Sequence, residues 1–385
     1  MEKTLLNIAF ILTAAKVGGL LSSKLKMPEV LGALVSGVVL GPAALNLVQY
    51  SDGIRLLANL GVIFLMFLAG LETNLKEFKK AGRSSLAIAV SGVLLPFVLG
   101  VLGASLFFSS RTENIFIGVI LTATSVSITV ETLTELGKLN TRAGVNILGA
   151  AVIDDILGLI LISVILAVAG KGGNTSLGVT LAKIAAFCLV SVLAIVFLPK
   201  MAEKHADRIR PGRTLLTFSF AAVLFAAFAA EKLGIAAITG AYLCGLLLSQ
   251  IKPKEYLVRN VKTVSSGFLA PIFFASVGIE TDVSGLNGEM LLITLVMFAV
   301  AVVGKVAGCG AAARLFRMTR RESLQIGTGM VSRGEVAIIT ANIGLQNHII
   351  SQEVFLPTIL VVILTTLATP IFLKLAFTRR SEARP

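Results

Sequence analysis

The chain has 385 residues, of which 56% are hydrophobic and only 14% are charged, and its mean hydropathy is +0.92. Soluble domains contain roughly 25% charged residues, so this composition excludes an ordinary water-soluble protein and indicates an integral membrane protein. The net charge of +13 would suit a nucleic-acid-binding protein if it were gathered on one soluble surface, but it is spread over short connections between apolar stretches.

Thirteen apolar stretches, each about the length needed to cross a bilayer, follow one another along the chain. The first contains Lys16 and is followed by no clear cleavage site, so we interpret it as a retained helix rather than a signal peptide. No soluble domain is evident at either end. The predicted helices span 4–21, 28–45, 54–71, 84–108, 114–136, 142–169, 177–199, 213–231, 234–250, 257–279, 289–312, 322–346 and 353–376.

Most of the 34 Lys and Arg residues lie in every second connection between these stretches. The connections at 72–83, 200–213 and 314–321 are strongly basic, whereas the alternate connections carry few basic residues. Cytoplasmic loops carry the excess of Lys and Arg in membrane proteins, so the alternation predicts an outside N-terminus and a cytoplasmic C-terminus. The basic charge is therefore a topology signal, and nucleic acid is not an expected partner.

One offset of 208 residues aligns three motifs in the first half of the chain with three in the second half. The first and eighth predicted helices start on opposite sides of the membrane, so the two halves would be inverted, as is typical of secondary transporters. A shared offset at three places disfavours a chance match of short apolar motifs. The pairs are "GLETNL" at 70–75 with "GIETDV" at 278–283, "LGALVSG" at 31–37 with "TGAYLCG" at 239–245, and "TSVS" at 124–127 with "SRGE" at 332–335.

Two predicted helices in corresponding places contain residues that interrupt helical hydrogen bonding: "LTATSVSITVET" in 114–136 and "GTGMVSRGEVAIIT" in 322–346. Broken helices of this kind expose carbonyl oxygens to cations in transporters, although Ser and Thr can also serve only close helix packing. Arg333 and Glu335 could balance each other and the half-helix dipoles, or act as structural support. The candidate residues of this crossing are Thr124, Ser125, Ser127, Ser332, Arg333 and Glu335.

Asp154 and Asp155 are adjacent in a stretch that carries no other charge from Val145 to Ala169. Each ionised residue at the bilayer centre costs roughly 2.5–3.5 kcal/mol, so both need a partner or a wet cavity. Lys305 is the candidate partner, because it also lies alone in an apolar helix. Successive helical residues point about 100° apart, so one Asp can pair with Lys305 while the other faces a cavity. A purely structural ion pair is the alternative.

A carboxylate binds either a proton or a hard cation such as Na+ or Li+, so competition for one Asp supplies antiport. A cation channel fits an inverted repeat less well than a closed, alternating site. An intramembrane aspartyl protease needs two Asp residues that converge from different helices, whereas these two are adjacent. We therefore expect no enzyme activity, no catalytic residues and no cofactor. The three cysteines lie far apart and predict neither a disulfide framework nor a metal centre.

The motifs together resemble those of bacterial monovalent cation/proton antiporters, most closely the NapA-like and GerN-like sodium/proton antiporters. They are "VLGALVSGVVLGP", "FLMFLAGLETNL", "VIDDI", Lys305 and "GMVSRGEVAIIT", and the resemblance covers nearly the whole transmembrane chain. It implies an all-α polytopic membrane protein with the NhaA-like antiporter fold, and a homodimer in the cytoplasmic membrane of a bacterium. By position, it implies that Asp155 binds the cation and the proton, with Thr124 as a further Na+ ligand. Asp154 would pair with Lys305 and release it when Na+ binds.

The resemblance also implies two structural parts and an elevator-like movement of one of them. The paired Asp residues resemble those of the electrogenic members, so the leading expectation is electrogenic Na+(Li+)/H+ exchange. K+/H+ or mixed Na+/H+–K+ exchange remains open, because ion choice depends on cavity size and ligand geometry. The expected parts are a dimerisation domain from helices in 1–83 and 213–285, a moving core from helices in 84–170 and 286–385, and a linker helix in 171–212.

Overall fold

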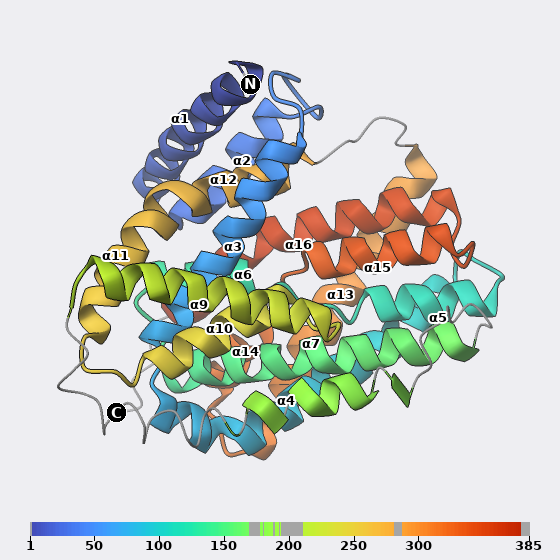
Figure 1. Cartoon of the computed structure of the whole chain (residues 1–385). Coiled ribbons are helices and arrows are strands. Elements are labelled where there is room, and N and C mark those ends of the chain that lie inside the picture. The colour runs from blue at the N-terminus through green and yellow to red at the C-terminus, as the bar shows by residue number, and fades with distance from the viewer. Residues whose placement is uncertain are drawn as a thin grey trace, which may run out of the picture. The chain divides into compact units, whose positions relative to one another are not determined.

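The computed structural model describes residues 2–168, 178–179, 181–187, 189–191, 193, 211–280 and 287–378. Every regular element within these ranges is a helix, which confirms the expected all-α class (Figure 1). Eight of the described helices are long and apolar enough to cross a membrane, and shorter apolar helices accompany them. The count of thirteen spans is not confirmed, since the stretch predicted at 177–199 lies largely outside the described residues.

The described residues 2–168 form seven helices, and the long stretch predicted at 114–136 is divided in two. Ser110 caps the first piece by accepting a hydrogen bond from the backbone N–H of Glu113 at 3.4 Å. The second piece begins after Ser125, which has an extended backbone conformation. The bounds are α1 (Glu2–Lys24), α2 (Glu29–Leu40), α3 (Asp52–Glu72), α4 (Leu75–Ala104), α5 (Arg111–Ile120), α6 (Val126–Glu135) and α7 (Arg142–Val168).

The second half repeats this plan, and the stretch predicted at 322–346 is also divided. Thr319 and Glu322 form a capping box at the start of its first piece, which ends at Gly329. The stretch predicted at 257–279 contains a π-helical turn that the sequence did not predict. The bounds are α9 (Arg213–Lys232), α10 (Ala237–Leu248), α11 (Lys254–Val264), η1 (Ser265–Leu269), α12 (Ala270–Ile279), α13 (Gly288–Leu315), α14 (Arg320–Gly329), α15 (Glu335–Gln346) and α16 (Gln352–Thr378).

The internal repeat is visible in the helix bounds. An offset of 208 residues carries α2 onto α10 at both ends, and it carries the first residue of α6 to the position before α15. Both interruptions therefore fall at the same place in their halves, between α5 and α6 and between α14 and α15. The expected pair of broken helices is confirmed.

The chain divides into two compact units that each combine segments from both halves. One unit contains α3, α9, α10 and α12, and the other contains α5, α6 and α13 to α16. In Figure 1, α9 lies beside α10 and α15 lies beside α16, each pair within its own unit. The chain passes from one unit to the other between Asp154 and Asp155. The transport roles assigned to the sequence segments stay predictions.

Glycines let helices from different halves touch backbone to backbone within the first of these units. A Cβ atom on Gly37 of α2 would lie 2.0 Å from the carbonyl oxygen of Ala275 in α12. A Cβ atom on Gly245 of α10 would lie 2.2 Å from the carbonyl oxygen of Phe67 in α3. The offset of 208 residues carries Gly37 to Gly245 and Phe67 to Ala275, so the two contacts are equivalent in the two halves of the chain.

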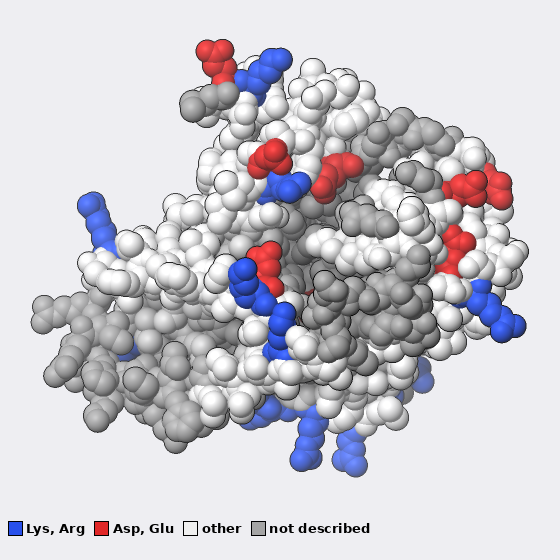
Figure 2. All heavy atoms as spheres, turned by 45° about the vertical axis from the view of Figure 1, so that its right-hand side comes forward, with Lys and Arg blue, Asp and Glu red and all other residues white. Residues whose placement is uncertain are grey.

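Apolar side chains dominate the surface. Figure 2 shows a face on which Lys, Arg, Asp and Glu are scattered over a largely uncharged surface. Large apolar side chains are exposed along several helices, including Phe218 and Phe225 of α9 at 71% and 73%. Exposed apolar surface on this scale suits lipid rather than water.

Candidate functional site

The centre of α7 carries a fully buried ion pair. Lys305 of α13 donates from Nζ to both carboxylate oxygens of Asp154, at 3.1 and 3.2 Å. The Lys305 side chain has no exposed area and that of Asp154 has 2%. Removing one partner of such a pair leaves an uncompensated buried charge and costs about 3–5 kcal/mol. The pairing inferred from the sequence is therefore present.

Asp155 has a different partner. Thr239, the third residue of α10, donates from Oγ1 to Oδ2 of Asp155 at 2.9 Å. Both side chains are buried. Our sequence analysis did not identify Thr239 as a site residue, although it opens the motif "TGAYLCG" that revealed the repeat. The two adjacent carboxylates thus turn to different helices, as the rotation of about 100° per residue requires.

The two helix interruptions meet. The backbone N–H of Ser125 donates to the carbonyl oxygen of Ser332 at 2.7 Å. The hydroxyl of Thr129, in the first turn of α6, donates to the carbonyl oxygen of Gly329 at the end of α14 at 2.8 Å. A Cβ atom on Gly334 would lie 2.6 Å from the Ser125 hydroxyl oxygen, so the crossing has no room for a larger residue at this position.

Arg333 places its charge at the ends of two half-helices. It is fully buried, and its Nη1 donates to the carbonyl oxygens of Ala123 at 3.3 Å and Val331 at 3.2 Å. Its Nη2 donates to the carbonyl oxygen of Leu121, the C-cap of α5. These carbonyl groups have no helical partner and lie where the helix dipole is negative. Arg333 therefore stabilises the crossing. The side chain of Glu335, the other charged residue predicted here, lies outside the described part of the chain.

Unpaired hydroxyl groups gather at the same crossing. The Oγ atoms of Ser125, Ser127 and Ser332 are buried and have no hydrogen-bond partner among the described residues. A buried polar group without a partner costs about 1–3 kcal/mol. Such a cluster is the composition expected of a site that receives water or a cation.

Thr124 also lies within interaction range of the Asp154 carboxylate, as does the charge of Arg333. The structure therefore brings Thr124, Asp154, Lys305 and Arg333 together within one compact unit. Asp155 is grouped with Thr239 in the other unit. The assignment of Thr124 as a Na+ ligand stays a prediction.

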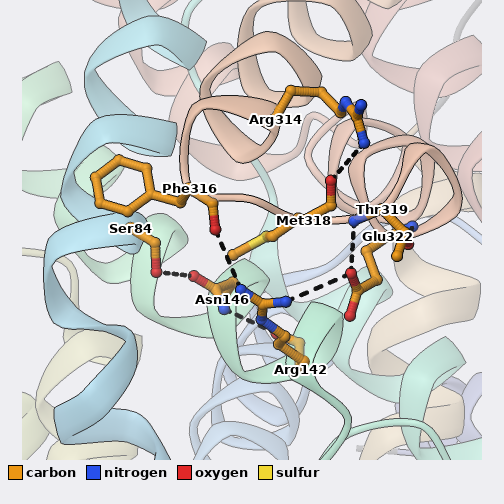
Figure 3. Close-up of polar contacts among 8 residues, drawn as sticks. All are labelled: Ser84, Arg142, Asn146, Arg314, Phe316, Met318, Thr319 and Glu322. Atoms are coloured by element: carbon orange, nitrogen blue, oxygen red, sulfur yellow. Dashed lines mark hydrogen bonds and ion pairs between the residues drawn. The ribbon is translucent and has the colours of Figure 1, made fainter.

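A polar network fixes the ends of the helices that carry the ion pair (Figure 3). Arg142, the first residue of α7, donates to the carbonyl oxygen of Phe316 at 3.2 Å and forms an ion pair with Glu322 of α14 at 3.7 Å. The hydroxyl of Ser84 in α4 donates to Oδ1 of Asn146 at 2.6 Å. Figure 3 shows these side chains converging from α4, α7 and α14 and from the segment after α13. The network holds the start of α7 against α4, α14 and the segment after α13.

The arrangement suits the handling of one small cation at a time. Lys305 balances the charge of Asp154. A single proton or a single monovalent cation on Asp155 would neutralise the second carboxylate. No group of three or more His, Cys, Asp or Glu side chains gathers within the described ranges, so a resident metal centre has no visible ligand set there.

Comparisons with known proteins agree with this chemistry. A family model described as "Sodium/hydrogen exchanger, transmembrane" matches residues 10–378. The Na(+)/H(+)-K(+) antiporter GerN of Bacillus cereus is 38% identical over 382 residues, which cover 98% of this chain and 97% of that protein. The Na(+)/H(+) antiporter of Enterococcus hirae is 35% identical over 378 residues, which cover 98% of each.

Solved structures show the same fold at low sequence identity. The sodium proton antiporter MjNhaP1 from Methanocaldococcus jannaschii aligns with a TM-score of 0.71 at 17% identity. The alignment covers 98% of this chain and 99% of that chain. This likeness confirms the fold class expected from the sequence.

Proposed function

Because the chain belongs to the transmembrane sodium/hydrogen exchanger family, we propose that it exchanges Na+ or Li+ for protons across the bacterial cytoplasmic membrane. The observation that carries the proposal is the buried Asp154–Lys305 pair beside Asp155. Since Lys305 neutralises Asp154, Asp155 is the carboxylate whose charge a transported ion must balance.

Competition at Asp155 couples the two ions. At high proton activity Asp155 is protonated and its cation leaves; at low proton activity the carboxylate is ionised and binds Na+ or Li+. Each bound ion neutralises the Asp155 carboxylate, so both loaded states can move between the two sides. The empty, ionised form keeps the charge of Asp155 in the apolar interior, which disfavours movement without a bound ion.

Asp154 and Lys305 make the exchange electrogenic in this scheme. Binding of Na+ near Asp154 weakens its attraction for Lys305, so the lysine is released from the pair. Electrogenic exchange requires more than one proton to cross for each Na+. The buried crossing supports this step, since its hydroxyl oxygens are suitable ligands for a cation in the interior.

Movement of the core would carry the site across the membrane. We propose an elevator-like displacement of helices in 84–170 and 286–385 against a dimerisation domain from helices in 1–83 and 213–285, joined by a linker in 171–212. The assembly is a homodimer with its N-terminus outside and its C-terminus in the cytoplasm. The alternating basic connections support this orientation.

Mixed Na+/H+–K+ exchange is the second candidate. The name of the GerN relative includes K+, and that protein aligns with 98% of this chain. Oxygen ligands accept either cation, and selection depends on how far the ligands can close around it.

The proposal is tested in proteoliposomes that hold a proton gradient. NaCl, LiCl or KCl is added separately, and the collapse of the gradient is followed with a pH-sensitive dye for the wild type and for Asp155→Asn. Asp52→Asn is the matched control, because the Asp52 side chain is 99% exposed. We expect Na+ and Li+ to collapse the gradient in the wild type and the control, and no response from Asp155→Asn.

The possible outcomes separate the candidates. An equal response to KCl identifies the mixed exchanger. Full exchange by Asp155→Asn refutes Asp155 as the carrier. A membrane potential that stimulates the wild-type rate supports electrogenic exchange, and a rate that ignores the potential refutes it.

A further inference from the structure

Thr239 is the group that α10 presents to Asp155. Its hydroxyl lies 2.9 Å from Oδ2 of Asp155, and both side chains are buried, at 2% and 8% exposure. Thr239 is the third residue of α10, so the free backbone N–H groups of the first helical turn lie next to it. The positive end of the helix dipole therefore favours a negative charge at this end of α10.

The helix that carries Thr239 is held rigidly. A Cβ atom on Gly240, the next residue, would lie 2.3 Å from the carbonyl oxygen of Ala226 in α9. Farther along α10, Gly245 is held against Phe67 of α3 in the same manner. Such contacts bring the backbone of α10 close to α9 and α3, so close helix packing places the Thr239 hydroxyl.

Apolar side chains follow Asp155 along α7. Ile156, Leu159 and Ile160, which follow Asp155 in α7, pack against a buried cluster that includes Ala230 and Ile235. A hydroxyl group lost from an apolar wall of this kind is not replaced by solvent. Removal of the Thr239 hydroxyl should therefore leave the Asp155 carboxylate without this hydrogen bond.

Asp155 has a charged neighbour in Asp154, which is adjacent in α7 and is paired with Lys305, and Arg333 lies near Asp154. α10 carries no Asp, Glu, Lys or Arg. The helix α9 has three charged residues, Arg213, Glu231 and Lys232, and all three are exposed.

We propose that Thr239 is a positioning residue that sets the balance between cation and proton at Asp155. A hydroxyl donates to a carboxylate and accepts from a carboxylic acid, so where the two side chains meet Thr239 can bind Asp155 in either protonation state. The bond to the ionised form is the stronger one, because charge-assisted hydrogen bonds are about twice as strong as neutral ones. Thr239 thus favours the ionised Asp155 that receives Na+. This inference rests on the proposed role of Asp155 as the carrier.

Thr239→Val and Thr239→Ser provide the test. Valine keeps the shape of threonine without the hydroxyl, whereas serine keeps the hydroxyl. In proteoliposomes we expect Thr239→Val to raise the Na+ concentration for half-maximal exchange about five- to tenfold. The pH of half-maximal exchange should rise by about 0.5–1 unit. Thr239→Ser should stay within about twofold of the wild type, which a merely structural role for the side chain does not predict.

Asp155→Asn is measured in the same series to separate this inference from the proposed function. If Asp155→Asn is inactive and Thr239→Val keeps the wild-type Na+ dependence and pH profile, the role of Thr239 is overturned and the carrier assignment stands. If Asp155→Asn still exchanges, both are overturned. If Thr239→Val does not fold, Thr239→Ala is measured in its place, and a wild-type profile in that variant overturns the role equally.

Discussion

Replacing Lys305 by methionine should destabilise the protein through Asp154. Methionine preserves most of the side-chain volume and leaves a carboxylate with 2% exposure without its cationic partner. We expect a loss of about 3–5 kcal/mol in the free energy of unfolding at neutral pH. Asp154→Asn should cost a similar amount, because it leaves the buried ammonium of Lys305 unpaired. The double variant removes both charges and should recover at least half of the summed loss.

Thermal unfolding in detergent measures this cycle. The chain contains no Trp, so a thiol-reactive dye is the better reporter. Cys309 of α13 has no exposed area and becomes reactive when the helix is released. The single variants should lower the apparent melting temperature by roughly 5–15 °C. The loss for Lys305→Met should shrink at acidic pH, since protonation of Asp154 removes the unpaired charge.

Additive losses would refute the reasoning. If the double variant loses as much as both single variants together, the contact between Lys305 and Asp154 contributes nothing beyond the separate packing of the two side chains. A Lys305→Met loss that does not depend on pH would also contradict an unpaired carboxylate as its cause.

Two further predictions concern the helix contacts, and the same unfolding assay measures both. Gly37→Ala would place a Cβ atom 2.0 Å from the carbonyl oxygen of Ala275 and should lower the free energy of unfolding by at least about 1–3 kcal/mol. Gly82→Ala is the control, because a Cβ at Gly82 meets open space and should not destabilise α4. Equal effects of the two changes would contradict the close contact at Gly37. Arg333→Met leaves three carbonyl groups without their donor and should cost several times the ~1 kcal/mol of a single hydrogen bond. Arg333→Lys should have an intermediate stability, because one ammonium group cannot reproduce the forked donors of arginine. Wild-type stability of either variant would show that the carbonyl contacts are dispensable.

Much of the fold could be predicted from the sequence, because the lengths of the apolar stretches, the basic loops and the internal repeat can be seen without knowing how the segments pack. The interruption of α5–α6 and of α14–α15 was predicted for the same reason, since Gly, Ser and Thr mark it locally. The start of α4 was placed too late. Asn74 accepts hydrogen bonds from the backbone N–H groups of Lys76 and Glu77 and begins a helix within a charged segment that resembled a loop.

The candidate site could be predicted only where charge marked it. Lys305 and Asp154 were paired because an isolated charge in an apolar helix needs a partner. Thr239 carries no charge, and threonine is common in membrane helices, so nothing in its own segment distinguished it. The carbonyl contacts of Arg333 were also hidden, since they depend on how two segments about 200 residues apart approach each other.

The exchanged glycine contacts have a consequence for biosynthesis. The surface of α3 that receives Gly245 remains unfilled until α10 has been synthesised, and translation adds about 5–20 residues per second. We therefore expect the first half to leave the ribosome with this contact unmade for about 10–35 s after α3 is synthesised. Protease sensitivity of chains stalled before and after α10 would reveal this interval.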